Sequence, residues 1–476
     1  MAGSVQVSPG VAITPSAVKA TLPSNYITNF DFLNQYLPDT YEKEFERYGN
    51  RSIASFLRQV GAEMPSNSDL IKWAEQGRLH TKYASCTSAA AAGSSTATWT
   101  VADSGITACN FRVGQTVFLS SNSGVASDKG IITAVNVGGS APLTFSVAYY
   151  ATGGQTIAVS TASTAFVYGS EFKKGSNGMA GSLEAQDTFY DNSPIIIKDN
   201  YDVSGSDMAQ IGWVEVTTEN GATGYLWYIK SEHETRLRFE DYMEMAMVEG
   251  VPAEASSGVA ALTSLTGSTA DLGNKGTKGL FYTVNQRGNV WAGGNPSTLA
   301  DFDAIIQRLD KQGAIQENVL FLNRNFSFDI DDMLAAQNSY GAGGTSFGLF
   351  NNDEKMALTL GFSGFKRGYE FYKTDWKYLN DAALRGGIKG GEINGVLVPA
   401  GSTTVYDQVM GKNAKRPFLH VRYRASETEN RRYKTWITGS AGGASTSDLD
   451  AMKVSFLSER ALCTLGANNF FLFKSA

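Results

Sequence analysis

The sequence predicts an α+β fold, mixed and irregular, that is built from several structural units. At roughly 150 residues per domain, a chain of 476 residues corresponds to about three such units. Amphipathic helical patterns and strand patterns alternate without the regular βαβ order of a parallel sheet. The composition also changes abruptly near residue 85, which indicates a small all-β domain inserted into a larger one.

Composition and charge exclude several classes of protein. The 46 acidic and 40 basic residues give a net charge of −6, which disfavours a globally basic nucleic-acid binder. Three cysteines without CxxC spacing encode neither a disulfide framework nor a zinc knuckle. Cys86 and Cys109 could pair, but a reduced cytoplasmic origin is the simpler interpretation. The N-terminus lacks a signal-peptide pattern, and no apolar run approaches about 18 residues, so we expect a soluble product.

Residues 1–84 are predicted to form a helical N-terminal arm. Helix start signals appear at Asp39, at Ser52 and at Ser68, each before a short apolar pattern that soon reaches Gly or Pro. Three short helices cannot bury a sizeable core among themselves. We therefore expect an arm that docks elsewhere, with a small helical domain as the alternative.

Residues 85–172 are predicted to be an inserted β-rich domain. Residues 85–170 contain only four charged side chains, and Ser, Thr, Ala, Gly and Val dominate. Short apolar and Thr-rich runs recur between turn signals, which is typical of a small barrel or sandwich. These runs cover residues 96–101, 116–119, 130–137, 143–149 and 164–168.

An extended hairpin over residues 173–229 is predicted to lead into a long helix over residues 231–248. Phe239, Tyr242, Met243, Ala246 and Met247 share one helical stripe, and Glu240, Asp241 and Glu244 lie away from it. Ser231 and Glu234 have capping-box spacing. The stripe predicts one buried face and one solvated face, and the helix belongs to a domain over residues 230–290.

The rest of the chain alternates between strand and helix patterns, in a domain over residues 291–424 and a C-terminal segment over residues 425–476. A helix is predicted after Ser297, with Gly313 as its stop, and another over residues 329–336. Predicted strands cover residues 279–284, 319–322, 356–361, 368–372, 395–398, 418–423, 433–438, 452–457 and 470–473.

Catalytic motifs are scarce. The only histidines are His80, His233 and His420, far apart and without metal-binding spacing. Residues 344–348 match the letters of a nucleophile elbow, GxSxG, but lie in a Gly-rich stretch without the required strand and helix. Residues 386–391 lack the spacing of a phosphate-binding loop. We expect no enzyme activity, no metal and no cofactor.

The order of these parts, together with three short sequence segments, resembles that of the major capsid proteins of tailed bacteriophages, which have the Hong Kong 97-like fold. The segments are IIIKDNYDVSG at residues 195–205, SERAL at residues 458–462 and GANNF at residues 466–470. They look closest to capsid proteins of crAss-like and related short-tailed phages. The resemblance implies an N-arm, an extended E-loop over residues 173–229, a P-domain with its spine helix, an A-domain, and a C-terminal return to the P-domain.

The resemblance also implies a function by self-association rather than turnover. Hexamers and pentamers would form an icosahedral head shell around packaged double-stranded DNA, in a virion made in the bacterial host cytoplasm. Portal, scaffold or decoration proteins are expected partners, and a membrane is not. The candidate E-loop residues are Lys198, Asp199, Tyr201, Ser204 and Asp207.

Residues 411–434 form a basic stretch, with eight cations against Glu427 and Glu429. We expect it to face packaged DNA or an acidic surface of a neighbouring subunit, with a solvated strand pair as the alternative. A tail or receptor-binding protein with a glycan-binding β module, and a glycan-processing enzyme with paired carboxylates, are the rival functions. The eight cations are Lys412, Lys415, Arg416, Arg422, Arg424, Arg431, Arg432 and Lys434.

Overall fold

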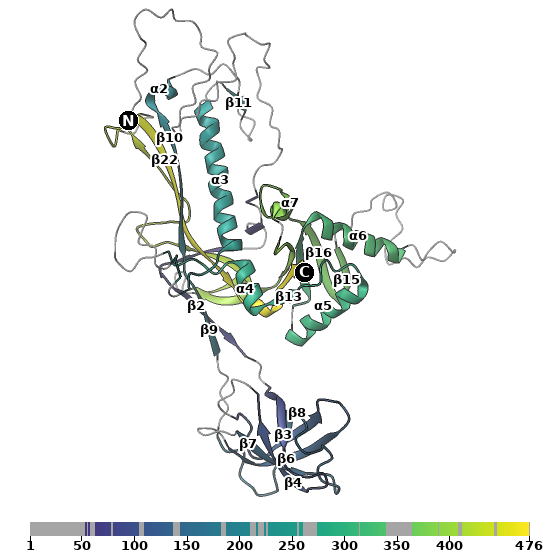
Figure 1. Cartoon of the computed structure of the whole chain (residues 1–476). Coiled ribbons are helices and arrows are strands. Elements are labelled where there is room, and N and C mark those ends of the chain that lie inside the picture. Colours follow the sequence, from purple (N-terminus) through teal and green to yellow (C-terminus); the bar gives the residue numbers. More distant parts are fainter. Residues whose placement is uncertain are drawn as a thin grey trace, which may run out of the picture. The chain divides into compact units, whose positions relative to one another are not determined.

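The computed structural model is a mixed α+β protein rich in strands (Figure 1). The chain separates into two compact units, Met1–Lys72 with Asp191–Ala476, and Trp73–Tyr190. The structure describes residues 53–475 except 55, 58–61, 78–79, 104–108, 137–142, 182–186, 210–215, 218–222, 225–226, 255–256, 260–273, 314, 339–363, 389, 408–411 and 442–444.

The unit Trp73–Tyr190 contains a closed six-stranded antiparallel barrel. Alternate strand residues such as Trp99, Leu119 and Phe145 point inward and are buried, so the strand period of two builds a single core. Phe111, which precedes a barrel strand, is buried in the same core. The five strand runs predicted for this region overlap five of the barrel strands, and the structure shows a small all-β barrel here. In barrel order the strands are β3 (Lys82–Ser88), β4 (Thr96–Val101), β7 (Thr144–Tyr149), β6 (Ser127–Val135), β5 (Gln115–Ser121) and β8 (Ser163–Ser170).

A buried carboxylate fixes the loop before β8. Asp128 on β6 accepts hydrogen bonds from the backbone amides of Thr156, at 3.0 Å, and Ile157, at 3.1 Å. The hydroxyl of Thr156 donates to the same carboxylate at 2.5 Å. Gln155 is also buried, and its amide nitrogen donates to the carbonyl of Ile157 at 2.6 Å. Asp128 and Gln155 therefore hold this loop against the barrel through hydrogen bonds to its backbone.

The other unit contains a five-stranded sheet around one long central strand, β22 (Ala451–Thr464). The whole of β10 (Ile195–Ser204) pairs antiparallel with residues 451–460 of β22. On the opposite side of β22 lie β21 (Lys434–Gly439) and β20 (Leu419–Arg424), and β1 (Ala62–Ser66) adds to β20 in parallel. The C-terminal part of the chain thus returns to the sheet that contains β1 and β10.

The long helix α3 (Trp227–Glu249) packs along this sheet (Figure 1). Phe239 and Met243 contact Tyr201 of β10 and Val454 and Phe456 of β22. The helix begins four residues before Ser231, so the predicted capping box is wrong: Ser231 lies inside the helix, and its carbonyl accepts the Thr235 hydroxyl at 2.9 Å.

The buried stripe of α3 also differs from the prediction. Phe239, Met243 and Met247 follow one another at four-residue steps and are buried, but Tyr242 remains 43% exposed. Glu244, predicted to face solvent, is buried. The physical reason is that the N-terminal segment packs on the face that the sequence pattern assigned to water.

A six-stranded sheet forms the rest of this unit, with both faces covered. The helices α5 (Leu299–Gln312) and α6 (Arg324–Asn338) cover one face, and α4 (Leu280–Arg287) lies in the core on the other. The sheet order is β13 (Asn289–Trp291), β23 (Phe471–Lys474), β17 (Ile393–Pro399), β14 (Glu317–Leu322), β16 (Tyr369–Asp375) and β15 (Gly364–Arg367).

Most predicted elements of this part are confirmed. α5 buries Phe302, Ile305 and Leu309, begins with a capping box between Thr298 and Asp301, and ends at Gly313 with φ of 69°. The predicted helix over residues 329–336 lies within α6. The predicted strand over residues 279–284 is wrong, because α4 occupies it. Its aromatic and β-branched residues suggested a strand, but core packing on a helical period decided the outcome.

The helical prediction for residues 70–74 is wrong as well. The Ser68 side chain forms a local turn by accepting from the Leu70 amide at 3.2 Å, and residues 71–76 form strand β2 (Ile71–Gln76). Ile71, Trp73 and Glu75 are its less exposed residues, a period of two. Phe56 and Leu57 are helical. The predicted helix after Asp39 lies outside the described residues, as do the strand at 356–361 and the GxSxG stretch at 344–348.

Short elements complete the chain. In the Gly-rich stretch that begins at residue 386, a short 3₁₀ turn covers Arg385–Gly387, and Gly390 and Gly391 have positive φ. No helix in the described part of the chain is long and apolar enough to cross a membrane. The remaining elements are β9 (Asp187–Asn192), paired with β2; α2 (Gly205–Met208); β11 (Val216–Thr217) with β12 (Thr223–Gly224); β18 (Ser402–Asp407) with β19 (Lys412–Pro417); α7 (Lys377–Asn380); η3 (Arg385–Gly387); and η4 (Ala467–Asn469).

Candidate functional site

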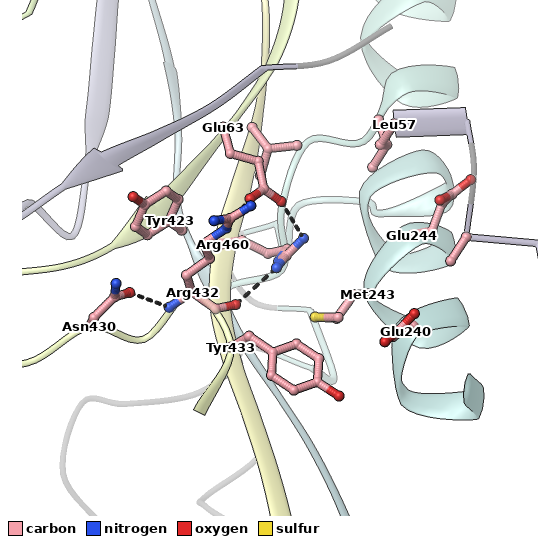
Figure 2. A pocket seen from close by; sticks show the side chains of 12 residues that line it. Leu57, Glu63, Glu240, Met243, Glu244, Tyr423, Asn430, Arg432, Tyr433 and Arg460 are labelled. Atoms are coloured by element: carbon pink, nitrogen blue, oxygen red, sulfur yellow. Dashed lines mark hydrogen bonds and ion pairs between the residues drawn. The ribbon is translucent and has the colours of Figure 1, made fainter. Parts of the chain in front are cut away.

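A polar cleft of about 640 Å³ lies between α3 and the five-stranded sheet (Figure 2). It brings together segments that are far apart in the sequence: the N-terminal segment, α3, β20, the loop before β21, and β22. Its charged lining residues are Glu63, Glu240, Glu244, Arg432 and Arg460. The cleft is therefore the place to test for catalysis, for ligand binding and for a structural role.

Glu63 on β1 is the centre of one charged cluster. Its carboxylate pairs with the guanidinium group of Arg432 and, at 3.4 Å, with that of Arg460. Arg460 also donates to the Ser458 hydroxyl at 2.9 Å. It donates to the Arg432 carbonyl at 2.9 Å as well (Figure 2). Arg460 is almost fully buried, so these contacts satisfy a guanidinium group that would be costly to bury alone. The cluster fastens β1 to the end of the loop and to β22.

A second cluster lies beside the first. Glu459 is buried and pairs with Arg431 at 2.9 Å and with Arg424 at 3.9 Å. Arg424 also pairs with Asp69, just after β1. Arg422 donates to the carbonyl of Pro65 at 3.2 Å. Because Arg422 and Arg424 bond to groups in or just after β1, they again attach the N-terminal strand to the sheet.

These contacts show which partners the predicted basic stretch has within the chain. Its described cations all have partners within the chain, and Lys434 pairs with Glu429 at 2.9 Å. Lys412, Lys415 and Arg416 belong to β19, and their side chains lie outside the described part. Three carboxylates from other segments, Glu63, Asp69 and Glu459, offset about half of the local charge of +6. Contact with DNA or with a neighbouring subunit stays a prediction.

Two carboxylates of α3 bind the N-terminal segment. Asp241 accepts the amide of Ile53 at 2.8 Å, and Glu244 accepts the amide of Phe56 at 2.9 Å. Phe56 inserts into the core, where its ring stacks on Trp376 at 4.3 Å and meets Phe321 edge-on at 4.6 Å. Acceptor and donor are 188 residues apart, so no local pattern in the sequence could reveal the pairing.

Two of the three carboxylates of the cleft are held in contacts with other segments. Glu63 is bonded to two arginines and Glu244 to a backbone amide, so both serve as acceptors in structural contacts. Among the described residues no cluster of His, Cys, Asp and Glu has the arrangement of a metal site. What this geometry does best is hold segments together.

The candidate E-loop residues lie on β10 and on the short helix after it. Lys198 is exposed, Asp199 pairs with Arg238 of α3 at 3.3 Å, and Tyr201 is buried against α3. Ser204 caps α2 by accepting from the Asp207 amide at 3.1 Å. The structure therefore places these five residues along one strand and its end, and their role as an E-loop stays a prediction.

The strand β21 lies at an edge of the five-stranded sheet and is largely exposed. It pairs only with β22 in the described part of the chain, and its residues are mostly exposed. Trp436 is 37% exposed and Ile437 42% exposed, on opposite faces. A free edge with apolar residues is a surface for pairing with another chain.

Comparisons with known proteins were made at the level of sequence and of structure. No protein-family model matches the sequence, and no curated protein is significantly similar to it. Solved structures do resemble the chain. One, from Microbacterium phage Oxtober96, has 10% sequence identity and a TM-score of 0.39, and the match covers 95% of this chain and 100% of that one.

Two other similar structures are capsids by their own titles. The capsid of a native GTA particle matches with 11% identity and a TM-score of 0.37, over 93% of this chain and 96% of that one. The mature capsid of bacteriophage PhiM1 matches with 10% identity and a TM-score of 0.33, over 65% and 79%. The finer resemblance to crAss-like phages stays a prediction.

Proposed function

We propose that the chain is the major capsid protein of a tailed bacteriophage, with the Hong Kong 97-like fold. It forms hexamers and pentamers that build an icosahedral head shell around double-stranded DNA. The protein is made in the bacterial host cytoplasm and resides in the virion. Portal, scaffold and decoration proteins are its expected partners.

One observation carries this proposal: the order of parts within a single unit. The N-terminal segment packs on the long helix α3, β10 runs beside β22, and the last strands return to both sheets, β22 to the first and β23 to the second. This is the order of N-arm, E-loop, spine helix, A-domain and C-terminal return on which the resemblance rests. The E-loop over residues 173–229 and the other domain boundaries belong to this proposal.

Exposed apolar side chains on this unit support self-association. Ile196 on β10, Tyr242 on α3, and Trp436 and Ile437 on β21 are each at least 37% exposed. Burying such side chains against another copy would gain about 25 cal/mol for each Å² of apolar surface. A shell subunit has many contacts of this kind, whereas an isolated enzyme gains nothing by displaying them.

The test is the size of the purified protein, measured by analytical ultracentrifugation, followed by negative-stain imaging of fast-sedimenting material. We expect hexamers, pentamers or closed shells. The double variant W436D/I437D should reduce assembly without unfolding the chain, and V125D, at an 87% exposed barrel position, is the control. A wild-type protein that stays a monomer with crowding agents and scaffold would overturn the proposal.

The DNA-facing role of the basic stretch needs a separate experiment, because Arg432 is also a structural residue. R432A removes a cation and one partner of Glu63, whereas E63Q weakens the same attachment and keeps the cation. If the stretch contacts DNA, only R432A lowers the DNA content per particle. Equal effects of both variants would assign Arg432 to the attachment of β1 alone.

A further inference from the structure

The barrel carries a row of side chains on its outer wall that its core does not need. Lys82 on β3 is opposite Phe166 on β8, Phe166 is opposite Phe118 on β5, and Phe118 is opposite Lys129 on β6. Directly opposed residues point to the same face of a sheet. Two aromatic rings are therefore flanked by one lysine on each side, across four neighbouring strands.

Two tyrosines extend this row. The Lys129 ammonium lies 5.8 Å from the ring centroids of both Phe118 and Tyr168, and the rings of Phe118 and Phe166 are 5.4 Å apart. Tyr150 donates its backbone amide to the carbonyl of Lys129 at 3.1 Å. We call Lys82, Phe118, Lys129, Tyr150, Phe166 and Tyr168 the aromatic wall.

The aromatic rings of the wall are exposed to solvent, and one of them is held in place by a hydrogen bond. Phe166 is 39% exposed, Tyr168 49% and Tyr150 50%. The Tyr150 hydroxyl donates to the carboxylate of Glu171 at 2.5 Å, which fixes that ring from the other end. A binding surface whose side chains are already ordered loses little conformational entropy when a ligand arrives.

The size of the aromatic wall disfavours a protein partner. An aromatic side chain presents roughly 200 Å² when fully accessible, so the three exposed rings offer about 300 Å² together. A stable protein–protein interface needs about 800 Å² on each partner. The surface instead suits a small or linear ligand with apolar faces.

The two lysines of the aromatic wall narrow the choice of ligand further. Lys82 and Lys129 are three strand spacings apart along the curved wall of the barrel, a path of about 14 Å, so an anionic chain that follows the wall can reach both. Single-stranded nucleic acid needs a continuous basic track along its backbone, whereas the aromatic wall contains only two lysines. Sugar rings have apolar C–H faces that stack on aromatic rings, and uronic acids add carboxylates at intervals.

We propose that the aromatic wall binds an acidic polysaccharide. The sugar rings stack on Phe166, Phe118 and Tyr168, and the carboxylates pair with Lys82 and Lys129. The inference goes beyond the proposed shell function and does not depend on it, because all six residues belong to the barrel unit.

The experiment measures binding of the full chain to immobilised polygalacturonate, with dextran as the neutral polymer and (dT)20 as the nucleic acid. We expect binding to polygalacturonate that weakens with salt and is at least tenfold tighter than binding to dextran or (dT)20. The double variant F166A/Y168A should lower the affinity at least tenfold. K82A/K129A should also lower it and flatten its salt dependence.

Matched controls separate this site from general effects. K173A/K174A removes the same charge from an exposed segment of the same unit, and Y372A removes an exposed tyrosine from the six-stranded sheet; neither should change binding. The conservative variant Y168F should keep it. Melting curves and sedimentation of each variant verify folding and oligomeric state. No binding to polygalacturonate, equal losses in the controls, or tighter binding of (dT)20 would overturn the proposal.

Discussion

The attachment of the N-terminal segment can be tested by replacing Phe56 with Ala. Its side chain is 1% exposed and lies between two aromatic partners, Trp376 of the loop after β16 and Phe321 of β14. Its amide binds Glu244 of α3. Phe56 therefore joins the long helix to the six-stranded sheet.

The magnitude follows from this burial. A Phe→Ala change in a core costs about 3–5 kcal/mol through lost transfer energy and the remaining cavity. Two aromatic contacts, worth about 0.5–1.5 kcal/mol each, place F56A in the upper half of that range, at about 4–5 kcal/mol. Leu refills part of the cavity, so F56L should cost about half as much.

Urea unfolding followed by tryptophan fluorescence measures the loss, with the barrel and the larger unit fitted as separate transitions. Only the transition of the larger unit should shift. F328A is the matched control, because that ring is 55% exposed and its removal should cost less than about 0.5 kcal/mol. A loss below 1 kcal/mol for F56A would show that the segment is not docked as described.

Three further predictions concern the barrel and α5. D128A leaves two amides and a hydroxyl without their acceptor and should destabilise the barrel by about 3 kcal/mol, measured in its own unfolding transition; an unchanged transition would contradict this. G313A forces Ala into the left-handed region and should cost about 1 kcal/mol by thermal melting, whereas G178A, which has open space, should be neutral. Burial raises the pKa of Tyr83 and of Tyr149 from 10.0 to about 12, so the neutral hydroxyls stabilise the barrel below pH 10, and this contribution is lost as the pH rises from 10 to 12. Barrel melting temperatures should therefore fall over that window, and a flat profile would refute the assignment.

Much of the fold could be predicted from the sequence where one period dominated a segment. Barrel strands such as residues 96–101 alternate between small polar and apolar residues, and α5 shows both its stripe and its caps. Predictions failed where a segment carried two signals. Residues 280–287 are aromatic and β-branched, as in a strand, but form a helix because its buried face packs in the core.

The candidate site was harder to predict because its contacts are long-range. The sequence showed eight cations close together and could not show that Glu63, Asp69 and Glu459 approach them from distant segments. It showed Asp241 and Glu244 on the polar side of a helix and could not show which backbone would cover them. A charge count along the chain measures composition, whereas the field at a surface depends on the fold.

The same reasoning explains why carboxylates and arginines collect where the N-terminal segment meets the sheet. A segment that joins a sheet through one parallel edge strand has few backbone bonds, so side chains must supply the rest. Ion pairs at such an edge also oppose wrong pairings, because a register shift of β1 would separate Glu63 from both arginines. The E63Q variant should therefore loosen the register of β1 more than it lowers global stability, and hydrogen exchange of the β1 amides, compared with those of β22, would measure the difference.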